Sequence, residues 1–190
     1  MLQEWKTVRQ RIDAIKSQKS YARIPDKLYL YLVLAEDHRF ESHFGCDPIS
    51  LIRAFWQSTF KNKRQGGSTI AMQLVRTISG NYEISIKRKI KEIILAVKLT
   101  SQYSKQDILA SYLSIAYLGW NMHGVEQACE RLNIELSNIS DYEAASIIAR
   151  LKYPEPRYLD TTLARRVKRR TTHIINLHRK FTYNEQYGAI

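Results

Sequence analysis

The chain has 190 residues, of which 44% are hydrophobic, and it carries a formal net charge of +12 with a pI near 9.7. This length favours one domain over residues 1–190, and the apolar content is sufficient for a buried core, which excludes global disorder. The positive charge favours an anionic partner, whether nucleic acid, an anionic membrane or a phosphate-bearing substrate.

Helical signals dominate the first half of the chain. Apolar residues between 28 and 35 recur at helical spacing, and residues 49–61 predict an amphipathic helix. Glycines at 66–67 interrupt this pattern. Either Ser68 or Thr69 can then cap a helix that runs through positions 74 and 75.

The second half predicts further helices with recognisable starts. A turn at Gly80-Asn81 is followed by Ser85, which has the character of an N-cap for a long helix. Capping-box patterns open helices at 104–107 and at 140–143, and a basic helix is expected over about 160–181. No convincing strand, internal repeat or low-complexity linker appears in the pattern, so the fold class predicted is all-α.

Cysteine usage and hydropathy add little. Cys46 and Cys129 fit no zinc or redox spacing and are expected to be unpaired thiols. The N-terminal residues 1–6 are polar and charged and do not have the form of a signal peptide. The longest uncharged run, 108–122, is shorter than a membrane span needs. The chain is therefore expected to be soluble or peripheral.

Glu36 is the first candidate for chemistry. It follows an apolar stretch, so its carboxylate is expected at the edge of a core, where partial burial would raise its pKa and suit it to proton transfer. If the helix continues, Glu36, Arg39 and His43 share a face, whereas Asp37 points elsewhere. The alternative is a helix-end carboxylate paired with Arg39, and this segment alone leaves both open.

A second candidate lies at Lys87-Arg88-Lys89 and Glu92. If Ser85 is the N-cap, three cations occupy the first helical turn, where the helix dipole prefers anions. Helix stability explains that placement badly, whereas an anion site explains it well, because free N–H groups and basic side chains would act together on a phosphate. The alternative is a solvated basic face.

The turn at 66–69 feeds a helix N-terminus, but it is not followed by the Gly-Lys-Ser/Thr of a phosphate-binding loop. Gln73 and Arg76 lie beyond it on one helical face, either as part of a site or simply as exposed polar residues. Residues 51–64 combine aromatic and aliphatic side chains with four basic ones. They fit either contact with lipid phosphates at a membrane surface or packing on the core.

Four motifs occur in a specific order over about residues 25–175. They are Glu36-Asp37-x-x-Phe40-x-x-His43-x-Gly45, Gly67-Ser68-Thr69-Ile70-x-x-Gln73-Leu74-Val75, Arg88-Lys89-x-x-Glu92 and Ile108-Leu109-x-x-Tyr112-Leu113. This series resembles the family 51 glycosyltransferases, the peptidoglycan glycosyltransferase domains of bifunctional penicillin-binding proteins and of their monofunctional relatives.

The resemblance implies a lysozyme-like head lobe and a small membrane-associating jaw lobe over about residues 46–65. It implies polymerisation of lipid II into a glycan strand with inversion, at the outer face of a bacterial cytoplasmic membrane. Other cell-wall synthesis proteins are possible partners, and nucleic acid is not expected. No cofactor is required, although a divalent cation, Mg²⁺ or Mn²⁺, is possible near Glu92.

The resemblance also implies roles for individual residues. Glu36 would be the general base that deprotonates the acceptor sugar hydroxyl, and Glu92 would assist departure of the lipid diphosphate. The remaining residues of the predicted substrate site would surround the diphosphate or line the donor cleft: Asp37, Arg39, His43, Ser68, Thr69, Gln73, Arg76, Arg88 and Lys89.

The chain departs from the family pattern at Ala71-Met72, where Thr-Gln is usual, at Arg76, where lysine is usual, and at Ser114, where asparagine is usual. Three other functions stay open beside the glycosyltransferase. A lytic glycosidase could use the same scaffold, a non-catalytic paralogue could bind a lipid-linked precursor, and a nucleic-acid-binding domain would rest on charge alone.

Overall fold

The computed structural model of the protein describes residues 1–18, 21, 23–60 and 66–187, and helices dominate them. The chain divides into two compact units, each built from two stretches of sequence. The first unit comprises Met1–Ser17 and Arg39–Tyr112, and the second comprises Gln18–His38 and Leu113–Ile190. The single domain expected over residues 1–190 stays a prediction.

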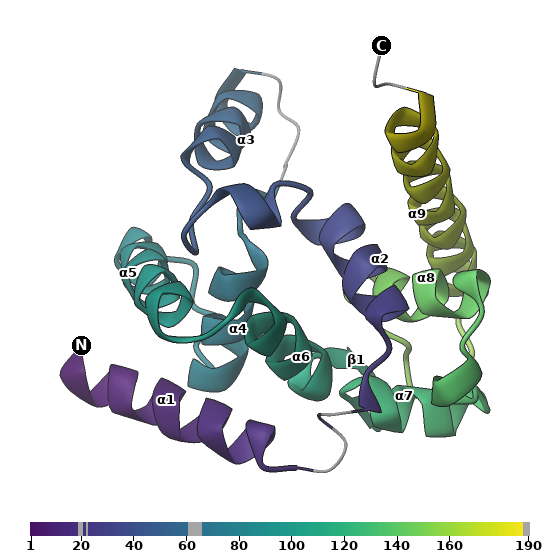
Figure 1. Cartoon of the computed structure of the whole chain (residues 1–190), viewed down its shortest axis with the longest axis horizontal. Coiled ribbons are helices and arrows are strands. Elements are labelled where there is room, and N and C mark those ends of the chain that lie inside the picture. The colour runs from purple at the N-terminus through teal and green to yellow at the C-terminus, as the bar shows by residue number, and fades with distance from the viewer. Residues whose placement is uncertain (19–20, 22, 61–65, 188–190) are drawn as a thin grey trace. The chain divides into compact units, whose positions relative to one another are not determined.

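The first unit is a cluster of helices around α4. Its described elements are α1 (Leu2–Lys16), the 3-10 turn η2 (Phe40–Ser42), α3 (Pro48–Phe60), α4 (Ile70–Ser79), α5 (Ile86–Gln102) and most of α6 (Lys105–Ile115). Helix α4 packs against both α1 and α5 (Figure 1). Helix α1 buries a stripe of side chains spaced three or four residues apart, which is the pattern of a helix with one face on a core. These residues are Trp5, Val8, Ile12 and Ile15.

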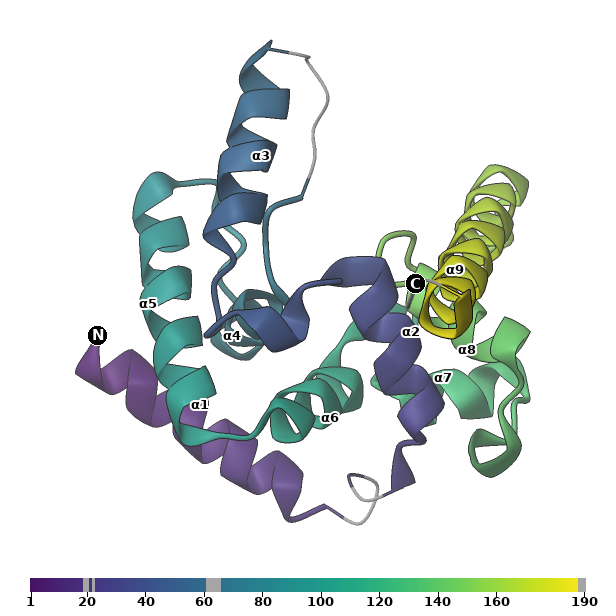
Figure 2. The ribbon, with the colours of Figure 1, turned by 45° about the horizontal axis from the view of Figure 1, so that its top comes forward.

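The second unit is built around three helices. Its described elements are α2 (Asp26–Glu36), β1 (Tyr117–Gly119), β2 (Met122–His123), α7 (Val125–Leu132), the 3-10 turn η3 (Leu136–Asn138), α8 (Asp141–Ala149) and α9 (Thr161–Tyr187). Helices α2, α8 and α9 pack against one another and lie side by side (Figure 2). The small residues Ala144, Ala145 and Ala149 of α8 are fully buried and allow this close approach.

The helix starts expected from sequence are confirmed. The Thr69 side chain accepts a hydrogen bond from the Met72 N–H and caps α4, and the Ser85 side chain accepts one from the Arg88 N–H and caps α5. Ser140 opens α8 with a full capping box. Helix α4 ends at Gly80, whose φ of 61° is a left-handed conformation that favours glycine.

The expectation of no strand is wrong in one place. Strands β1 and β2 pair antiparallel, with Tyr117 opposite His123, and Gly119 forms an isolated bridge with Glu155. These pairings are short and non-local, so no alternating run announces them in the sequence. The all-α class is confirmed, because the strands are only three and two residues long.

None of the described helices is long and apolar enough to cross a membrane. Cys46 and Cys129 are free thiols, as expected. The small jaw lobe over residues 46–65 stays a prediction, and its residues 61–65 lie outside the described part of the chain.

Candidate active site

A buried carboxylate surrounded by cations occupies the interface of α4 and α5 in the first unit. Glu92 is only 3% exposed, and Arg76 binds it through two hydrogen bonds, Nε to Oε1 at 2.7 Å and Nη2 to Oε2 at 3.0 Å. Arg88 donates to Oε1 from one helical turn earlier, and the Lys89 Nζ lies 3.9 Å from Oε2. These four residues form the cluster that we call the Glu92 cluster.

Local sequence places this cluster. Capping by Thr69 fixes the start of α4, so that Arg76 lies two turns later on the side facing α5. Capping by Ser85 fixes the start of α5, which puts Arg88 and Lys89 in its first turn and Glu92 one turn further on. The cations of that first turn therefore surround a carboxylate of the chain itself, and the anion site expected there stays a prediction.

Ser68 joins the two sides of the cluster. Its hydroxyl oxygen accepts hydrogen bonds from the Lys89 Nζ at 2.7 Å and from the Arg76 Nη2 at 3.2 Å. Because one oxygen accepts hydrogen bonds from both cations, it holds them at a fixed separation. Such prearrangement is what an oxyanion or phosphate needs, because no reorganisation is then required when the anion arrives.

The charges of the cluster do not balance. Three cations meet one carboxylate, so two positive charges are in excess at a partly buried position. Hydrogen bonding to Glu92 raises the pKa of Arg76, whereas burial lowers the pKa of Lys89. The directions differ because Arg76 has a two-point bond that outweighs its burial, while the 3.9 Å separation gives Lys89 too little compensation.

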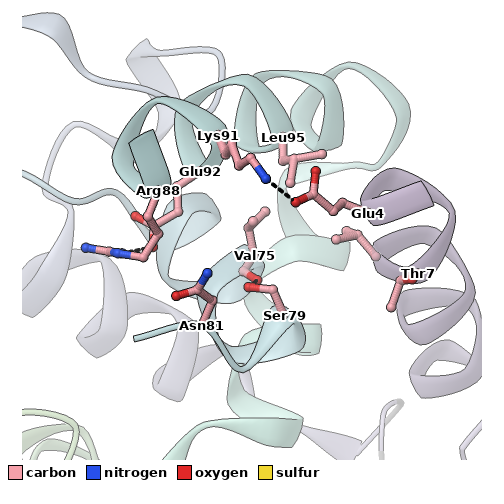
Figure 3. Close-up of a pocket in the computed structure, with 10 residues that line it drawn as sticks. Glu4, Thr7, Val75, Ser79, Asn81, Arg88, Lys91, Glu92 and Leu95 are labelled. Carbon is pink, nitrogen blue, oxygen red and sulfur yellow. Dashed lines mark hydrogen bonds and ion pairs between the residues drawn. The ribbon is translucent and has the colours of Figure 1, made fainter. Parts of the chain in front are cut away.

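A cavity of about 210 Å³ lies behind the cluster, between α1, α4 and α5 (Figure 3). Val75 and Leu95 form apolar walls, and Arg88 and Glu92 border it from α5. Across the cavity, the Lys91 Nζ donates to a Glu4 carboxylate oxygen at 2.6 Å and ties α5 to α1.

Arg39 and His43 do not lie on the helix that carries Glu36, which corrects the expectation of a shared face. Helix α2 ends at Glu36 because Asp37 adopts φ −157° and ψ 67°, outside the helical region. Arg39 Nε lies 3.3 Å from Oδ2 of the buried Asp47, and His43 is buried edge-on to the Phe40 ring. Asp37 is itself 7% exposed.

Gly45 fixes the segment between α2 and α3 against α5. Its φ is +85°, and a Cβ at this position would lie 2.2 Å from the carbonyl oxygen of Ala96. Its own carbonyl accepts a hydrogen bond of 2.6 Å from the Thr69 hydroxyl. Thr69, predicted to line a donor cleft, is 2% exposed and joins the loop to the start of α4.

Two of the three α4 residues that depart from the family pattern, Ala71 and Met72, face the core, whereas the third, Arg76, binds Glu92. Ala71 and Met72 are completely buried, so neither side chain lines an open cleft. Gln73 on the next position is partly exposed, and its Oε1 accepts a 2.7 Å hydrogen bond from the Tyr112 hydroxyl. Gln73 is thereby held in one orientation.

Glu36 lies at the C-terminal end of α2, in the second unit. Its side chain is 19% exposed, and Oε1 accepts a hydrogen bond of 3.1 Å from the Arg170 Nη2 on α9. The same Nη2 donates to the Ala35 carbonyl at 2.8 Å. The alternative considered from sequence was a helix-end carboxylate paired with Arg39. The ion-pair partner in the structure is Arg170, from the far end of the sequence.

Sequence reasoning missed two of these residues. Asp47 anchors Arg39 and accepts bonds from the Ile49 N–H and the Ser50 hydroxyl at the start of α3. Burial opposes ionisation of Asp47, but the bonds from Ser50 and the charge of Arg39 lower its pKa overall. The dipeptide Asp47-Pro48 is a recognisable helix start and could have indicated it. Arg170 had no such signal, because it is one of several cations in a basic helix.

The Glu92 cluster has the character of an anion site. Among the described residues, no three His, Cys, Asp or Glu side chains lie close enough together to hold a metal ion. The neighbours of Glu92 are cations, which disfavour a divalent ion at the same place. The residues present therefore do not fit the divalent cation considered near Glu92.

The transglycosylase family model matches residues 5–178. The chain belongs to the transglycosylase family. Penicillin-binding protein 1A of Haemophilus influenzae is 33% identical over 171 residues, which cover 88% of this chain and 20% of that protein. Penicillin-binding protein 1A of Aquifex aeolicus is 38% identical over 116 residues, covering 58% of this chain and 15% of that protein.

A third relative, penicillin-binding protein 1A of Escherichia coli, is 37% identical over 109 residues. These cover 57% of this transglycosylase chain and 13% of the Escherichia coli protein. The chain thus spans about a fifth or less of the length of these relatives. The family explains why the four motifs occur in this order, and the resemblance stated from sequence is confirmed.

Proposed function

We propose that this transglycosylase chain is a peptidoglycan glycosyltransferase that polymerises lipid II into glycan strands with inversion and releases the lipid diphosphate. The observation that carries this proposal is the Glu92 cluster, in which three cations meet one carboxylate. A diphosphate leaving group develops negative charge as its bond to the sugar breaks. Prearranged cations with an excess of positive charge stabilise this negative charge on the diphosphate.

In the proposed reaction, the bond between the anomeric carbon and the diphosphate oxygen breaks while an acceptor sugar oxygen forms a new bond to that carbon. Arg76, Arg88 and Lys89 bind the diphosphate oxygens, which leave as an anion. Glu92 neutralises one of the three charges and orients the guanidinium of Arg76. A divalent ion is not part of this step, because the residues around Glu92 do not fit one.

Glu36 supplies the base in this proposal. Its carboxylate takes the proton of the acceptor hydroxyl as the new glycosidic bond forms. The Arg170 Nη2, which donates to Oε1 at 3.1 Å, holds the carboxylate in one orientation for this role. Ser68 and Gln73 contact the donor. The segment after Glu36 is held by Asp37, Arg39 and His43. Thr69 positions Ser68 because it caps α4.

We also place the reaction at the outer face of a bacterial cytoplasmic membrane, since its substrate is lipid-linked. Helix α3 supports a membrane-facing role, because Ile52 and Trp56 on one side of it are 69% and 57% exposed. The basic residues expected at 61–64 lie outside the described residues. Nascent glycan strand and other cell-wall synthesis proteins complete the set of proposed partners.

Two alternatives lose support. A lytic glycosidase needs no cation cluster for its leaving group, so the excess charge around Glu92 would have no purpose there. Loss of polar contacts at Ala71 and Met72 would favour a non-catalytic paralogue, but both residues lie in the core and do not alter a polar surface.

The direct test is incubation of the purified protein with lipid II in detergent, followed by separation of products on a gel. We expect long glycan polymer and released lipid diphosphate. Cleavage of preformed strands without any lipid-linked donor would refute the polymerase and favour the lytic enzyme.

We expect the polymerisation rate to fall at alkaline pH as Lys89 loses its proton. Burial lowers the pKa of Lys89 from the ordinary 10.5, and the charged form exists below the pKa and is lost as pH rises. Lys89→Arg should therefore extend activity to higher pH, because arginine stays protonated. The pH–rate profile measures this, with Lys87→Arg on the same turn as the control; superimposable alkaline limbs for wild type and Lys89→Arg would contradict the role.

Arg170 is expected to act as a positioning residue for Glu36. Arg170→Gln removes the charged donor that holds the Glu36 carboxylate at 3.1 Å, so kcat should fall by about tenfold while KM changes by less than about twofold. Arg170→Lys should restore part of the rate, and Arg169→Gln, on the exposed face of α9, should have no effect. A lower thermal unfolding midpoint with an unchanged kcat would indicate a purely structural contact.

A further inference from the structure

Helix α5 has two apolar faces, and the core accounts for only one of them. Leu95, Ala96 and Leu99 are buried against the rest of the first unit. A second set of large aliphatic side chains is exposed at i, i+4, i+8 and i+11, which places them along one line of the helix surface. They are Ile86, Ile90, Ile94 and Val97, and Ile84 precedes them in the turn. We call these five residues the α5 stripe.

Exposure along the α5 stripe decreases steadily from its N-terminal end. The exposed fractions are 97% for Ile84, 81% for Ile86, 52% for Ile90, 46% for Ile94 and 42% for Val97. Scattered exposed aliphatic residues are ordinary, but a continuous row on a helix whose other face is already buried is not. The N-terminal end of the stripe therefore has the most apolar surface to bury against an external partner.

Charge along the stripe indicates what that partner is. Lysines follow three of the stripe residues by one position, at Lys87, Lys91 and Lys98, so they lie along one edge of the stripe. The only acidic residue of α5 is Glu92, which is buried. Two carboxylates lie near this edge, the exposed Glu83 before Ile84 and the Glu4 of α1 that pairs with Lys91, so the three lysines leave the edge with a net positive charge. An aliphatic row with a net positive edge is complementary to hydrocarbon beneath anionic headgroups.

We propose that the α5 stripe docks this chain onto an anionic bilayer, with Ile84 and Ile86 entering the acyl-chain boundary and Lys87 meeting lipid phosphates. The inference deepens the proposed function and rests on it in one respect. The first turn of α5 carries Arg88 and Lys89, so docking by this end holds the diphosphate site at the level where the diphosphate of a membrane-embedded substrate lies. This contact is distinct from the one proposed for α3.

The test is flotation of the purified protein with vesicles of phosphatidylcholine containing phosphatidylglycerol. The variant Ile84→Ser/Ile86→Ser/Ile90→Ser is expected to lower the vesicle partition coefficient by about tenfold. A matched control, Tyr158→Ser/Leu159→Ser/Tyr183→Ser, removes exposed apolar side chains of the second unit and should change it less than about twofold. Because all six positions are exposed, both variants should keep the thermal unfolding of wild type.

Two further arms make the proposal specific. Lys87→Gln should weaken binding about fivefold on phosphatidylglycerol vesicles and leave binding to pure phosphatidylcholine unchanged. Ile86→Ser should weaken binding more than Val97→Ser, following the exposure gradient. Equal partition of the stripe variant and wild type would overturn the proposal. The proposal would also be overturned if that variant lost self-association but kept vesicle binding. Such a result would assign the stripe to a contact between copies of the chain.

Polymerisation in detergent separates this inference from the proposed function. The stripe variant should retain wild-type polymer formation from lipid II dispersed in detergent and lose it on vesicles. If wild type makes no polymer in detergent, the proposed function fails, while the flotation result still decides the docking surface.

Discussion

Glu36→Gln is expected to reduce polymerisation by at least about 100-fold, since general-base catalysis contributes roughly 10² to 10⁴ in rate. The amide cannot accept the acceptor proton, but its oxygen can still receive the hydrogen bond from Arg170 that the carboxylate receives at 3.1 Å. The fold should therefore persist. The measurement is the initial rate of polymer formation from lipid II in detergent, together with the thermal unfolding midpoint.

Glu41→Gln is the matched control for this variant. Glu41 is exposed in the short turn η2, five positions after Glu36, and its neutralisation should leave the rate unchanged. Substrate binding to Glu36→Gln should also remain, because the base acts only as the bond forms. Turnover near the wild-type rate in Glu36→Gln would refute the base assignment.

Glu92→Gln is expected to affect both stability and rate. It leaves Arg76, Arg88 and Lys89 together without their carboxylate, at a position where Glu92 is only 3% exposed. Removing one partner of a buried ion pair costs about 3 kcal/mol or more, which corresponds to a fall of about 6 to 12 °C in the melting temperature at this chain length. The polymerisation rate should fall by about 10² because the cations lose their orientation.

Inorganic pyrophosphate distinguishes an anion site from a merely structural ion pair. Pyrophosphate should raise the melting temperature of Glu92→Gln more than that of wild type. In the variant it no longer competes with the Glu92 carboxylate for the three cations. Glu83→Gln is the control: Glu83 is exposed just before α5, and its side chain is not part of the cluster. If pyrophosphate has no effect on either protein, the cluster does not bind the leaving group.

Sequence patterns predict the helical class and the starts of α4, α5, α6, α8 and α9, because these depend on local interactions, whereas they do not predict α1 or α7. The caps at Thr69, Ser85 and Ser140 each join groups three residues apart, so their partners are visible in the sequence. The cations ahead of Glu92 were detectable for the same reason, since their placement against the helix dipole is a local anomaly. The order of the motifs then identified the family.

The partners of the candidate site residues follow from the packing of distant segments and not from local sequence. Glu36 and Arg170 are 134 positions apart, and their pairing depends on the packing of α2 with α9 rather than on any local pattern. Packing also placed Ala71 and Met72 in the core, and it left the α5 stripe uncovered. Local periodicity predicts that a helix has an apolar face, but which of two apolar faces becomes buried depends on the helices that arrive from elsewhere in the chain.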